Sequence, residues 1–371
     1  MILALAIFKA LFIFGTGVQL AYWLLFFSKV SKYTDVGSIP TDHAQPVSVI
    51  ICARNESENL KKNLPRFLNQ NYPSFEIIVV DDDSSDNSAE VVLEFQKKNS
   101  ILSLVRILDK KHTGKKAALA AGIQAAKHEV LLLSDADCFP ASSNWIWRMQ
   151  SVLQGSIQIG LGFSPYFFQN GFLNRFIRFE AIYTAVQYFS FALAGIPYMG
   201  VGRNLIYAKS LFLRNGGFSK HLEIASGDDD LFVSAAAEKH NTAVLMHPDS
   251  FVFSTPKRTW RGYYNQKSRH LSTSTRYKPI HQWILGLLSL SHYLHYMAGI
   301  AVLCCGGSWM FVMSFYLART LVVAVQSWFI LRKFKDTALF WWIPLLDAVM
   351  IIYYHVFAPI FIIGNPRTWK L

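Results

Sequence analysis

The sequence predicts an α/β domain flanked by transmembrane helices, and two patterns lead to this prediction. In the middle of the chain, continuous apolar runs alternate with segments of helical periodicity, which is typical of parallel strands covered on both faces. Toward both ends, the chain stays apolar over the roughly 20 residues that one membrane crossing needs. With 371 residues, of which 52% are hydrophobic and 16% charged, the chain is too apolar for a wholly soluble protein.

Four membrane helices are expected, one near the N-terminus and three toward the C-terminus. Residues 1–28 are almost uncharged and lack the basic start and cleavage site of a signal peptide, which favours an uncleaved anchor. A polar linker is expected over 29–46. The C-terminal membrane region is expected over 281–371, with helices at 283–304, 308–331 and 338–363.

The net charge of +12 is concentrated beside these helices. Basic residues follow the first helix, fill the stretch 257–278 and lie between the last two helices. Because basic segments flank the cytoplasmic ends of membrane helices, we expect a multi-pass protein of the inner (cytoplasmic) membrane whose soluble domain faces the cytoplasm. The same distribution argues against nucleic acid as a partner, since the cations do not gather on a domain of their own.

The soluble domain is expected over 47–280. Strands are predicted over 47–52, 76–80, 101–108 and 130–133, and helices from about Ser57 and over 87–98 and 117–126. In sheets of this kind, ligands bind at the carboxyl ends of the strands. Residues that directly follow a strand are therefore the first candidates for a functional site.

The segment 167–195 has apolar residues at helical spacing with polar residues between them. It is interpreted as an amphipathic helix lying in the membrane interface. The alternative is an ordinary core helix of the soluble domain.

Two acidic pairs follow predicted strands. Asp135 and Asp137 stand two residues apart, and in an extended chain such side chains point to the same side. Two converging carboxylates bind a hard cation such as Mg²⁺ or Mn²⁺ and leave positions for diphosphate oxygens. Asp81 and Asp82 follow another strand, where a carboxylate accepts hydrogen bonds from a base or a ribose. The alternatives are a solvated turn for the first pair and helix capping around the second.

Three further segments carry candidate groups. Lys115 follows a glycine at the start of a helix, where backbone N–H groups and an ammonium suit phosphate. The acidic run 228–230 offers a general base, since repulsion and burial move the pKa of a carboxyl toward working pH. Arg269, in the segment Gln266–Arg269, is a candidate for neutralising a leaving phosphate, although alone it also suits a membrane surface.

Taken in order, these segments resemble one family. They comprise Pro46–Glu56, Val80-Asp81-Asp82, Gly114-Lys115, Asp135-Ala136-Asp137, Gly227–Leu231 and Gln266–Arg269. The series resembles the membrane-bound branch of glycosyltransferase family 2 over roughly residues 46–275. The resemblance implies the GT-A fold, with a Rossmann-like and mostly parallel sheet, and inverting chemistry that depends on Mg²⁺ or Mn²⁺.

The resemblance also implies roles for the matching residues. The nucleotide-sugar would lie against Ala53, Glu56, Asp81, Asp82, Lys115 and Asp135, and the metal against Asp135 and Asp137. Alignment on Leu231 implies that Asp228 is the base, with Asp229 as a rival and Arg269 assisting the leaving group. The acceptor would lie against Gln266, His270, Arg203 and Asn204.

Three positions depart from the family pattern. Asp83 stands where the family usually has glycine, and Gly227 stands where it has glutamate. His270 stands where the family has a tryptophan that stacks on the acceptor sugar in polymer-making members. The missing tryptophan argues against processive synthesis.

The implied function is the transfer of a sugar from a nucleotide-sugar, with UDP-sugars favoured, to a hydroxyl of a membrane lipid or glycolipid. Such a reaction belongs to cell-envelope biogenesis. One alternative is a processive polysaccharide synthase of the same family, which predicts polymer growing on one chain. Another is a catalytically silent membrane scaffold that binds a nucleotide-sugar. It predicts nucleotide affinity without turnover, and no effect of Asp228→Asn.

Two charged residues interrupt the C-terminal apolar helices. Arg319 and Asp347 are expected at similar depths in the membrane, where charges are costly and usually paired or functional. We therefore expect them to pair with each other. Such a pair acts either as structural glue between helices or as part of a portal for a lipid acceptor.

Overall fold

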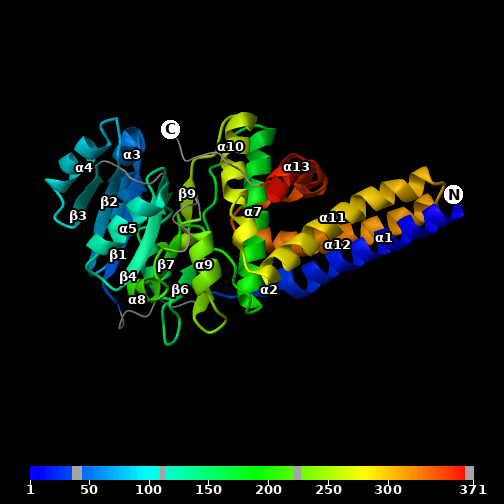
Figure 1. Cartoon of the computed structure of the whole chain (residues 1–371), viewed down its shortest axis with the longest axis horizontal. Helices are drawn as coiled ribbons and strands as arrows, with labels where there is room; N and C mark the ends of the chain where they lie inside the picture. Colours follow the sequence, from blue (N-terminus) through cyan, green and yellow to red (C-terminus); the bar gives the residue numbers. More distant parts are fainter. Residues whose placement is uncertain (36–43, 109–113, 220–226, 364–371) are drawn as a thin grey trace. The chain divides into compact units, whose positions relative to one another are not determined.

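The computed structural model describes residues 1–35, 44–108, 114–219 and 227–363 (Figure 1). The chain divides into two compact units. The first, called the helical unit below, joins Met1–Tyr33 to the segment that begins at Tyr277. The second, called the sheet unit, is Thr34–Arg276.

The sheet unit contains a seven-stranded sheet with the order β3-β2-β1-β4-β7-β6-β8. The strands are β1 (Val47–Ala53), β2 (Phe75–Asp82), β3 (Leu102–Ile107), β4 (Val130–Asp135), β6 (Ile159–Leu161), β7 (Leu205–Ala208) and β8 (Thr242–Val244). Strands β1 to β4 are mutually parallel, whereas β7 runs antiparallel to β4 and β6. The four strands predicted from the sequence form the parallel part, which confirms the mostly parallel sheet. A separate antiparallel pair joins β5 (Cys138–Pro140) to β9 (Val252–Ser254).

Helices cover both faces of the parallel strands. On one face, α3 (Ser57–Leu68), α4 (Ser88–Gln96) and α6 (Trp145–Gln150) contribute to one buried core with the strands. On the other face, α5 (Lys116–Ala125) packs closely, because a Cβ at Gly122 would lie 2.6 Å from Ile50 and 2.9 Å from Val80. Because both faces of these strands are buried, their sequences are continuous apolar runs.

The remaining helices of the sheet unit are α7 (Phe172–Leu193), α8 (Lys209–Arg214), α9 (Asp230–Ala236) and α10 (Trp260–Leu271). Helix α7 lies within the segment 167–195, for which an interfacial helix and a core helix are the two interpretations. Helix α7 is buried on several faces and includes the buried polar residues Asn174 and Glu180. Lys267 of α10 forms an ion pair with Glu180 at 2.7 Å, so this carboxylate is paired inside the sheet unit.

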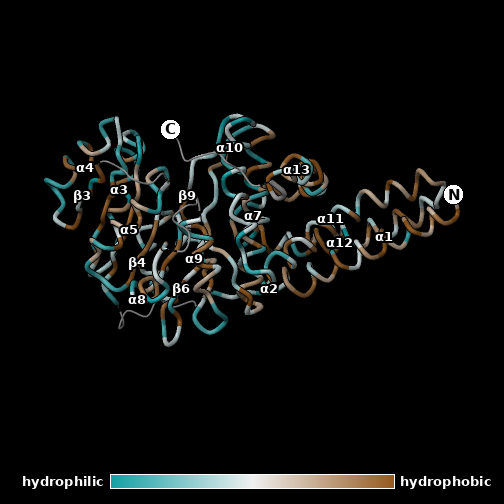
Figure 2. The backbone as a smooth tube through the Cα atoms, viewed as in Figure 1, coloured by the Kyte–Doolittle hydropathy of each residue, from teal (hydrophilic) through white to brown (hydrophobic). Residues whose placement is uncertain are grey.

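The helical unit contains α1 (Ile2–Ala21), a π-helical stretch (Tyr22–Phe27), α2 (Ser28–Lys32), α11 (Pro279–Cys304), α12 (Trp309–Lys333), a 3₁₀ helix (Thr337–Trp342) and α13 (Ile343–Ile363). Among the described residues, four helical segments are long and apolar enough to cross a membrane. Figure 2 shows hydrophobic residues along their length. In Figure 1, α1, α11 and α12 run side by side, whereas α13 is seen nearly end-on.

The first helix extends into the segment expected as a linker over 29–46. It continues to Lys32 because its last carbonyl groups find a donor: Nζ of Lys333 donates to the carbonyl oxygens of Val30 and Tyr33. Residues 36–43 of the expected linker lie outside the described part of the chain.

Candidate functional site

Lys115 lies at the centre of the site. Its ammonium group forms an ion pair with Asp135 and lies 3.4 Å from Oδ2 of Asp228. Lys115 precedes α5, Asp135 ends β4 and Asp228 precedes α9. The Lys115 and Asp228 side chains are only 11% and 12% exposed. The structure thus joins three segments that the sequence singled out separately.

The charge of Lys115 is secured by its neighbours. Burial alone would lower the pKa of Lys115, but the carboxylates of Asp135 and Asp228 outweigh burial and raise it well above its usual value. The side chain is therefore cationic throughout the physiological pH range. An ammonium held at a fixed point at the start of a helix suits a phosphate oxygen.

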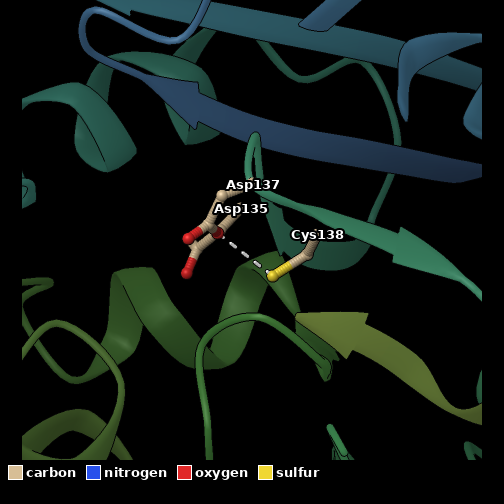
Figure 3. Close-up of side chains that lie close together, drawn as sticks. All are labelled: Asp135, Asp137 and Cys138. Atoms are coloured by element: carbon tan, nitrogen blue, oxygen red, sulfur yellow. Dashed lines mark hydrogen bonds between the residues drawn. The ribbon is translucent and has the colours of Figure 1, made fainter. Parts of the chain in front are cut away.

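Asp135 and Asp137 converge as the sequence predicts, together with Cys138. The ligand atoms of the three side chains lie within 4.8 Å of one another. Figure 3 shows the two carboxylates side by side, with the thiol of Cys138 donating a hydrogen bond to Oδ1 of Asp137 at 3.2 Å. Burial and the nearby carboxylates raise the pKa of the Cys138 thiol well above its usual value, which disfavours the thiolate form that binds metal. The hard oxygen donors that remain fit Mg²⁺ or Mn²⁺.

The carboxylate of Asp229 is held by backbone N–H groups. Its Oδ2 accepts a hydrogen bond from Gly202 at 2.5 Å, and its Oδ1 accepts one from Asp230 at 2.8 Å, at the start of α9. Gly202 permits this approach, because a Cβ there would lie 3.0 Å from the Cβ of Asp229. Both oxygens of Asp229 are therefore engaged in positioning α9.

The acidic run raises the proton affinity of Asp229. Burial, followed by the charges of Asp228 and Asp230, raises the pKa of Asp229 from 3.8 to about 7. Asp230 accepts a hydrogen bond from Leu231 N–H through Oδ1 and one from the Thr273 hydroxyl through Oδ2. Within the described part of the chain, Asp228 makes its ion pair with Lys115 and receives no backbone N–H. Of the three, Asp228 is the carboxylate that is least engaged in holding the backbone.

Gly227, which departs from the family pattern, meets a local requirement. Its φ of +88° lies in the left-handed region that favours glycine. A Cβ at this position would also approach the side chain of Leu231 to 2.5 Å. A glutamate would therefore not fit this backbone without a shift.

The residues predicted to bind the nucleotide lie at neighbouring strand ends. Ala53 of β1 pairs in register with Asp81 of β2, and Cys52 pairs with Asp135 of β4. Asp81 and Asp82 are each 2% exposed. Oδ2 of Asp81 lies 3.6 Å from Nε of Arg106, so this carboxylate is already paired within the fold.

Glu56 and Asp83 lie beyond the ends of the same two strands. Glu56 precedes α3, where its Oε2 accepts a hydrogen bond from Asn59 at 2.5 Å. Asp83 has a φ of +58°. The position usually held by glycine in the family is thus left-handed here, a conformation that Asp tolerates better than most residues.

Of the two predicted acceptor residues that precede β7, Asn204 is engaged within the core. It is fully buried, and its amide donates to the carbonyl oxygens of Phe163 at 2.7 Å and Ser250 at 2.8 Å. Its Oδ1 accepts a hydrogen bond from the indole N–H of Trp145 at 3.0 Å. The side chain is saturated and holds three segments of the core together. These contacts favour a structural role for Asn204, and its acceptor role stays a prediction.

Arg203 is partly exposed and remains a candidate. Its Nη1 donates to the hydroxyl of Tyr166 at 3.0 Å, and its guanidinium lies 4.6 Å from the centroid of that ring. Arg203 also lies near enough to Asp137 and Cys138 to interact electrostatically with both. It therefore belongs to the same site as the predicted metal ligands.

Gln266, Arg269 and His270 lie on α10, which begins at Thr259, whose hydroxyl accepts from Gly262 N–H. The end of α10 is tied to the acidic run, because Thr273 donates to Oδ2 of Asp230 and to the carbonyl oxygen of His270. Helix α10 is thus anchored beside α9.

Sequence reasoning missed several residues that shape the site. Thr273, Gly202, Cys138 and Tyr166 each contact a predicted site residue. Cysteine and threonine carry no motif of their own here, and their positions depend on contacts between distant segments. Gly202, two residues before Asn204, was the one signal in the sequence that another segment packs closely against the backbone there.

A comparison with protein families finds a match to the family described as "Glycosyl transferase family 2" over residues 48–205. This region covers β1 to β7 and includes the predicted nucleotide and metal residues. A computed likeness to a solved structure agrees: the mannosyltransferase PcManGT from Pyrobaculum calidifontis, in complex with GDP-Man and Mn²⁺, superposes with a TM-score of 0.59 at 18% identity. The likeness covers 94% of this chain and 99% of that one. The fold is therefore the GT-A fold.

Curated relatives match over shorter stretches. A poly-beta-1,6-N-acetyl-D-glucosamine synthase of Staphylococcus epidermidis is 35% identical over 123 residues, which are 31% of this chain and 29% of that protein. Glycosyltransferase AglE of Haloferax volcanii is 29% identical over 191 residues, or 49% of this chain and 58% of that protein. The matches thus span less than two thirds of these relatives. Together with the family match, they show that this part of the chain is similar to glycosyltransferases.

Proposed function

We propose, from the match of residues 48–205 to glycosyl transferase family 2, that the chain moves a sugar from a nucleotide-sugar to a hydroxyl of a membrane lipid or glycolipid, with inversion at the sugar carbon. The observation that carries this proposal is the position of Lys115 between Asp135 and Asp228. Lys115 links Asp135, which is suited to a metal and a diphosphate, with Asp228, which is suited to act as a base. An acceptor activated at Asp228 would therefore react next to the donor diphosphate.

The donor side is assigned to the strand ends. Asp81 and Asp82 border the nucleoside, and Lys115 attracts the diphosphate. Asp135 and Asp137 would hold Mg²⁺ or Mn²⁺, which when bound neutralises charge on the departing diphosphate. Arg269 on α10 is assigned to the same negative charge.

Asp228 is assigned as the general base in preference to Asp229. Asp228 takes the proton of the acceptor hydroxyl while the acceptor oxygen bonds to the anomeric carbon. The bond from that carbon to the diphosphate oxygen breaks, and the nucleoside diphosphate leaves on the opposite face. The preference rests on hydrogen bonding, because both oxygens of Asp229 are engaged by backbone N–H groups.

The membrane setting supports a lipid-linked acceptor. Four apolar helical segments long enough to cross a bilayer would keep the sheet unit at the membrane surface. We place the sheet unit in the cytoplasm, where nucleotide-sugars are made, in accord with the basic residues beside the helices. Gln266, His270 and Arg203 are assigned to the acceptor side.

A second candidate function is processive polysaccharide synthesis. It is favoured by the relative from Staphylococcus epidermidis, whose name describes a polymer synthase. His270, in the position of the family's acceptor-stacking tryptophan, favours single addition instead. The two functions differ in product length.

The test is to purify the full chain with native lipids and to measure nucleotide release from UDP-, GDP- and dTDP-sugars with Mn²⁺, Mg²⁺ or chelator. Release from one donor that needs lipid extract and metal supports the proposal. Mass spectrometry of the lipid product distinguishes one added sugar from a polymer. Donor binding without release under any condition, unchanged by Asp228→Asn, would contradict a transferase and favour the silent scaffold.

A further inference from the structure

The helical unit contains an ion pair in its interior. Nη1 of Arg319 lies 2.6 Å from Oδ2 of Asp347, and Nη2 lies 3.1 Å from Oδ1. Arg319 is 1% exposed and Asp347 is 4% exposed. The structure therefore confirms the pairing predicted from the sequence, in the bidentate geometry that gives Arg–carboxylate pairs their strength.

The pair is joined by polar groups from two other helices. Gln19 of α1 accepts a hydrogen bond from Nη2 of Arg319 at 3.0 Å, and the hydroxyl of Tyr296 on α11 donates to Oδ2 of Asp347 at 2.7 Å. His292 of α11 lies 3.3 Å from Oδ1 of Asp347. The guanidinium and the carboxylate thus compensate each other, and the pair carries no net charge toward a ligand.

A cavity of about 220 Å³ lies against this pair. Its apolar wall is formed by α12, the 3₁₀ helix and the start of α13, and it includes Val323, Ala324 and Ile343. Trp341 also lines it and is 86% exposed, so the cavity reaches the surface of the helical unit. A dry cavity of about 150 Å³ already holds a benzene-sized ligand, so this cavity has room for the head of a small lipid or a stretch of its chain.

The polar wall of the cavity carries two hydroxyl groups in addition to the ion pair. Tyr316 and Thr320 both line it. Within the described part of the chain, neither hydroxyl has a hydrogen-bond partner. The ring of Tyr316 stacks on that of His295, with the two ring centroids 6.0 Å apart. Both residues are only partly exposed and line the cavity, which leaves their hydroxyls available to a ligand. A polar ligand would satisfy both groups at once.

We propose that this cavity binds an uncharged, hydroxyl-bearing lipid of the diacylglycerol type. Its hydroxyl and ester oxygens hydrogen-bond to Tyr316 and Thr320, and its hydrocarbon lies along the apolar wall. A lipid phosphate is disfavoured, since Arg319 is already neutralised by Asp347 and a second anion would lie beside the carboxylate. The site is a binding site in its own right, whether or not the bound lipid serves as the acceptor.

The test uses the full chain in detergent with a photoreactive diacylglycerol that carries a diazirine in one acyl chain, and without any nucleotide-sugar. Irradiation should label peptides of α12 or α13, and unlabelled diacylglycerol should compete at least tenfold better than phosphatidylglycerol. The double variant Tyr316→Phe/Thr320→Val removes only two hydroxyls and should reduce labelling at least fivefold. Ala324→Trp fills the cavity and should reduce labelling similarly.

Ser314→Ala is the matched control, because Ser314 is an exposed serine on the same helix whose hydroxyl bonds to the carbonyl oxygen of Phe311. Its labelling should equal that of the unmodified protein. The proposal is overturned by equal labelling of the double variant, by labelling confined to other peptides, or by equal competition from phosphatidylglycerol. Since no transfer reaction is measured, failure here leaves the proposed transferase activity standing, and the reverse also holds.

Discussion

The ammonium group of Lys115 lies 3.4 Å from Oδ2 of Asp228 while it also forms an ion pair with Asp135. This one side chain therefore connects the start of α5, the end of β4 and the residues before α9. The arrangement places a cation that we assign to the donor diphosphate beside the carboxylate that we assign as base. It also gives the sharpest predictions for activity.

Asp228→Asn should lower the turnover number by about 100- to 10,000-fold, the range that a positioned general base contributes. The reason is that an amide cannot take the acceptor proton. Affinity for the nucleoside diphosphate, measured by calorimetry, should stay within about threefold because Lys115 and the metal ligands remain. The control is Asp249→Asn. Asp249 is a partly exposed aspartate whose carboxylate lies near Arg148 and His247. Equal activity of the two variants would remove Asp228 from the mechanism.

Removal of divalent metal should abolish sugar transfer, and Mn²⁺ or Mg²⁺ should restore it. Asp137→Ala should bind Mn²⁺ at least tenfold more weakly, as measured by the electron paramagnetic resonance signal of free Mn²⁺. Cys138→Ala should bind Mn²⁺ normally, because the protonated thiol donates to Asp137 rather than binding metal. Loss of Mn²⁺ binding in Cys138→Ala would show that the thiol is a ligand after all.

The raised pKa of Asp229 predicts how stability depends on pH. Its pKa is about 7 in the folded protein and near 3.8 when unfolded, so the folded state binds the proton more tightly. The contribution of Asp229 to the free energy of unfolding therefore decreases as pH rises from about 4 to about 7. Outside that window this contribution does not change with pH. Thermal unfolding without metal or nucleotide should show a smaller decrease in Tm between pH 5 and pH 7.5 for Asp229→Asn. If Tm changes equally with pH in the unmodified protein and in Asp229→Asn, the raised pKa of Asp229 is refuted.

Substitutions at Asp83 should depend on backbone conformation. At a φ of +58°, glycine has no steric cost, so Asp83→Gly should lie within about 0.5 kcal/mol of the original stability. Asp83→Val should lower the free energy of unfolding by about 1–2 kcal/mol, because a β-branched residue fits this region poorly. Equilibrium denaturation measures both, and a valine variant as stable as the glycine variant would contradict the assigned conformation.

The Arg319–Asp347 pair predicts strong coupling between two substitutions. Arg319→Leu or Asp347→Leu alone leaves one uncompensated buried charge and should cost about 3–5 kcal/mol. The double variant removes both charges and should recover most of that loss, as seen in the Tm of the full chain in detergent. Additive losses in the double variant would mean that the two charges do not act as a pair.

The parallel strands were predictable because the evidence for them is local. Apolar runs such as 47–52 and 130–133 need no distant partner to be recognised, and the acidic residues after them mark the strand ends. The convergence of Asp135 and Asp137 also followed from their spacing of two along an extended chain. The short strands β6 to β9 were not predicted, since runs of three or four residues carry little periodicity.

The functions of individual polar residues were less predictable. Asn204 follows a motif-like glycine segment, yet its side chain serves Trp145, Phe163 and Ser250 from distant parts of the chain. The polar residues of α7 suggested a membrane interface, whereas Glu180 is satisfied by Lys267 of α10. Hydrogen-bond partners that lie far apart in sequence leave no local pattern.

The sequence by itself determined the long apolar helices, the parallel strands β1 to β4 and the order of the acidic clusters, because hydrophobic periodicity and strand ends are local properties. Only the tertiary structure decided which carboxylate of the run 228–230 holds the backbone and which one faces Lys115. It also decided that Arg319 and Asp347 meet in a bidentate pair beside a cavity. The physical reason is the same in both cases: burial and hydrogen bonding set the state of a charged group, and both depend on residues that folding brings from elsewhere in the chain.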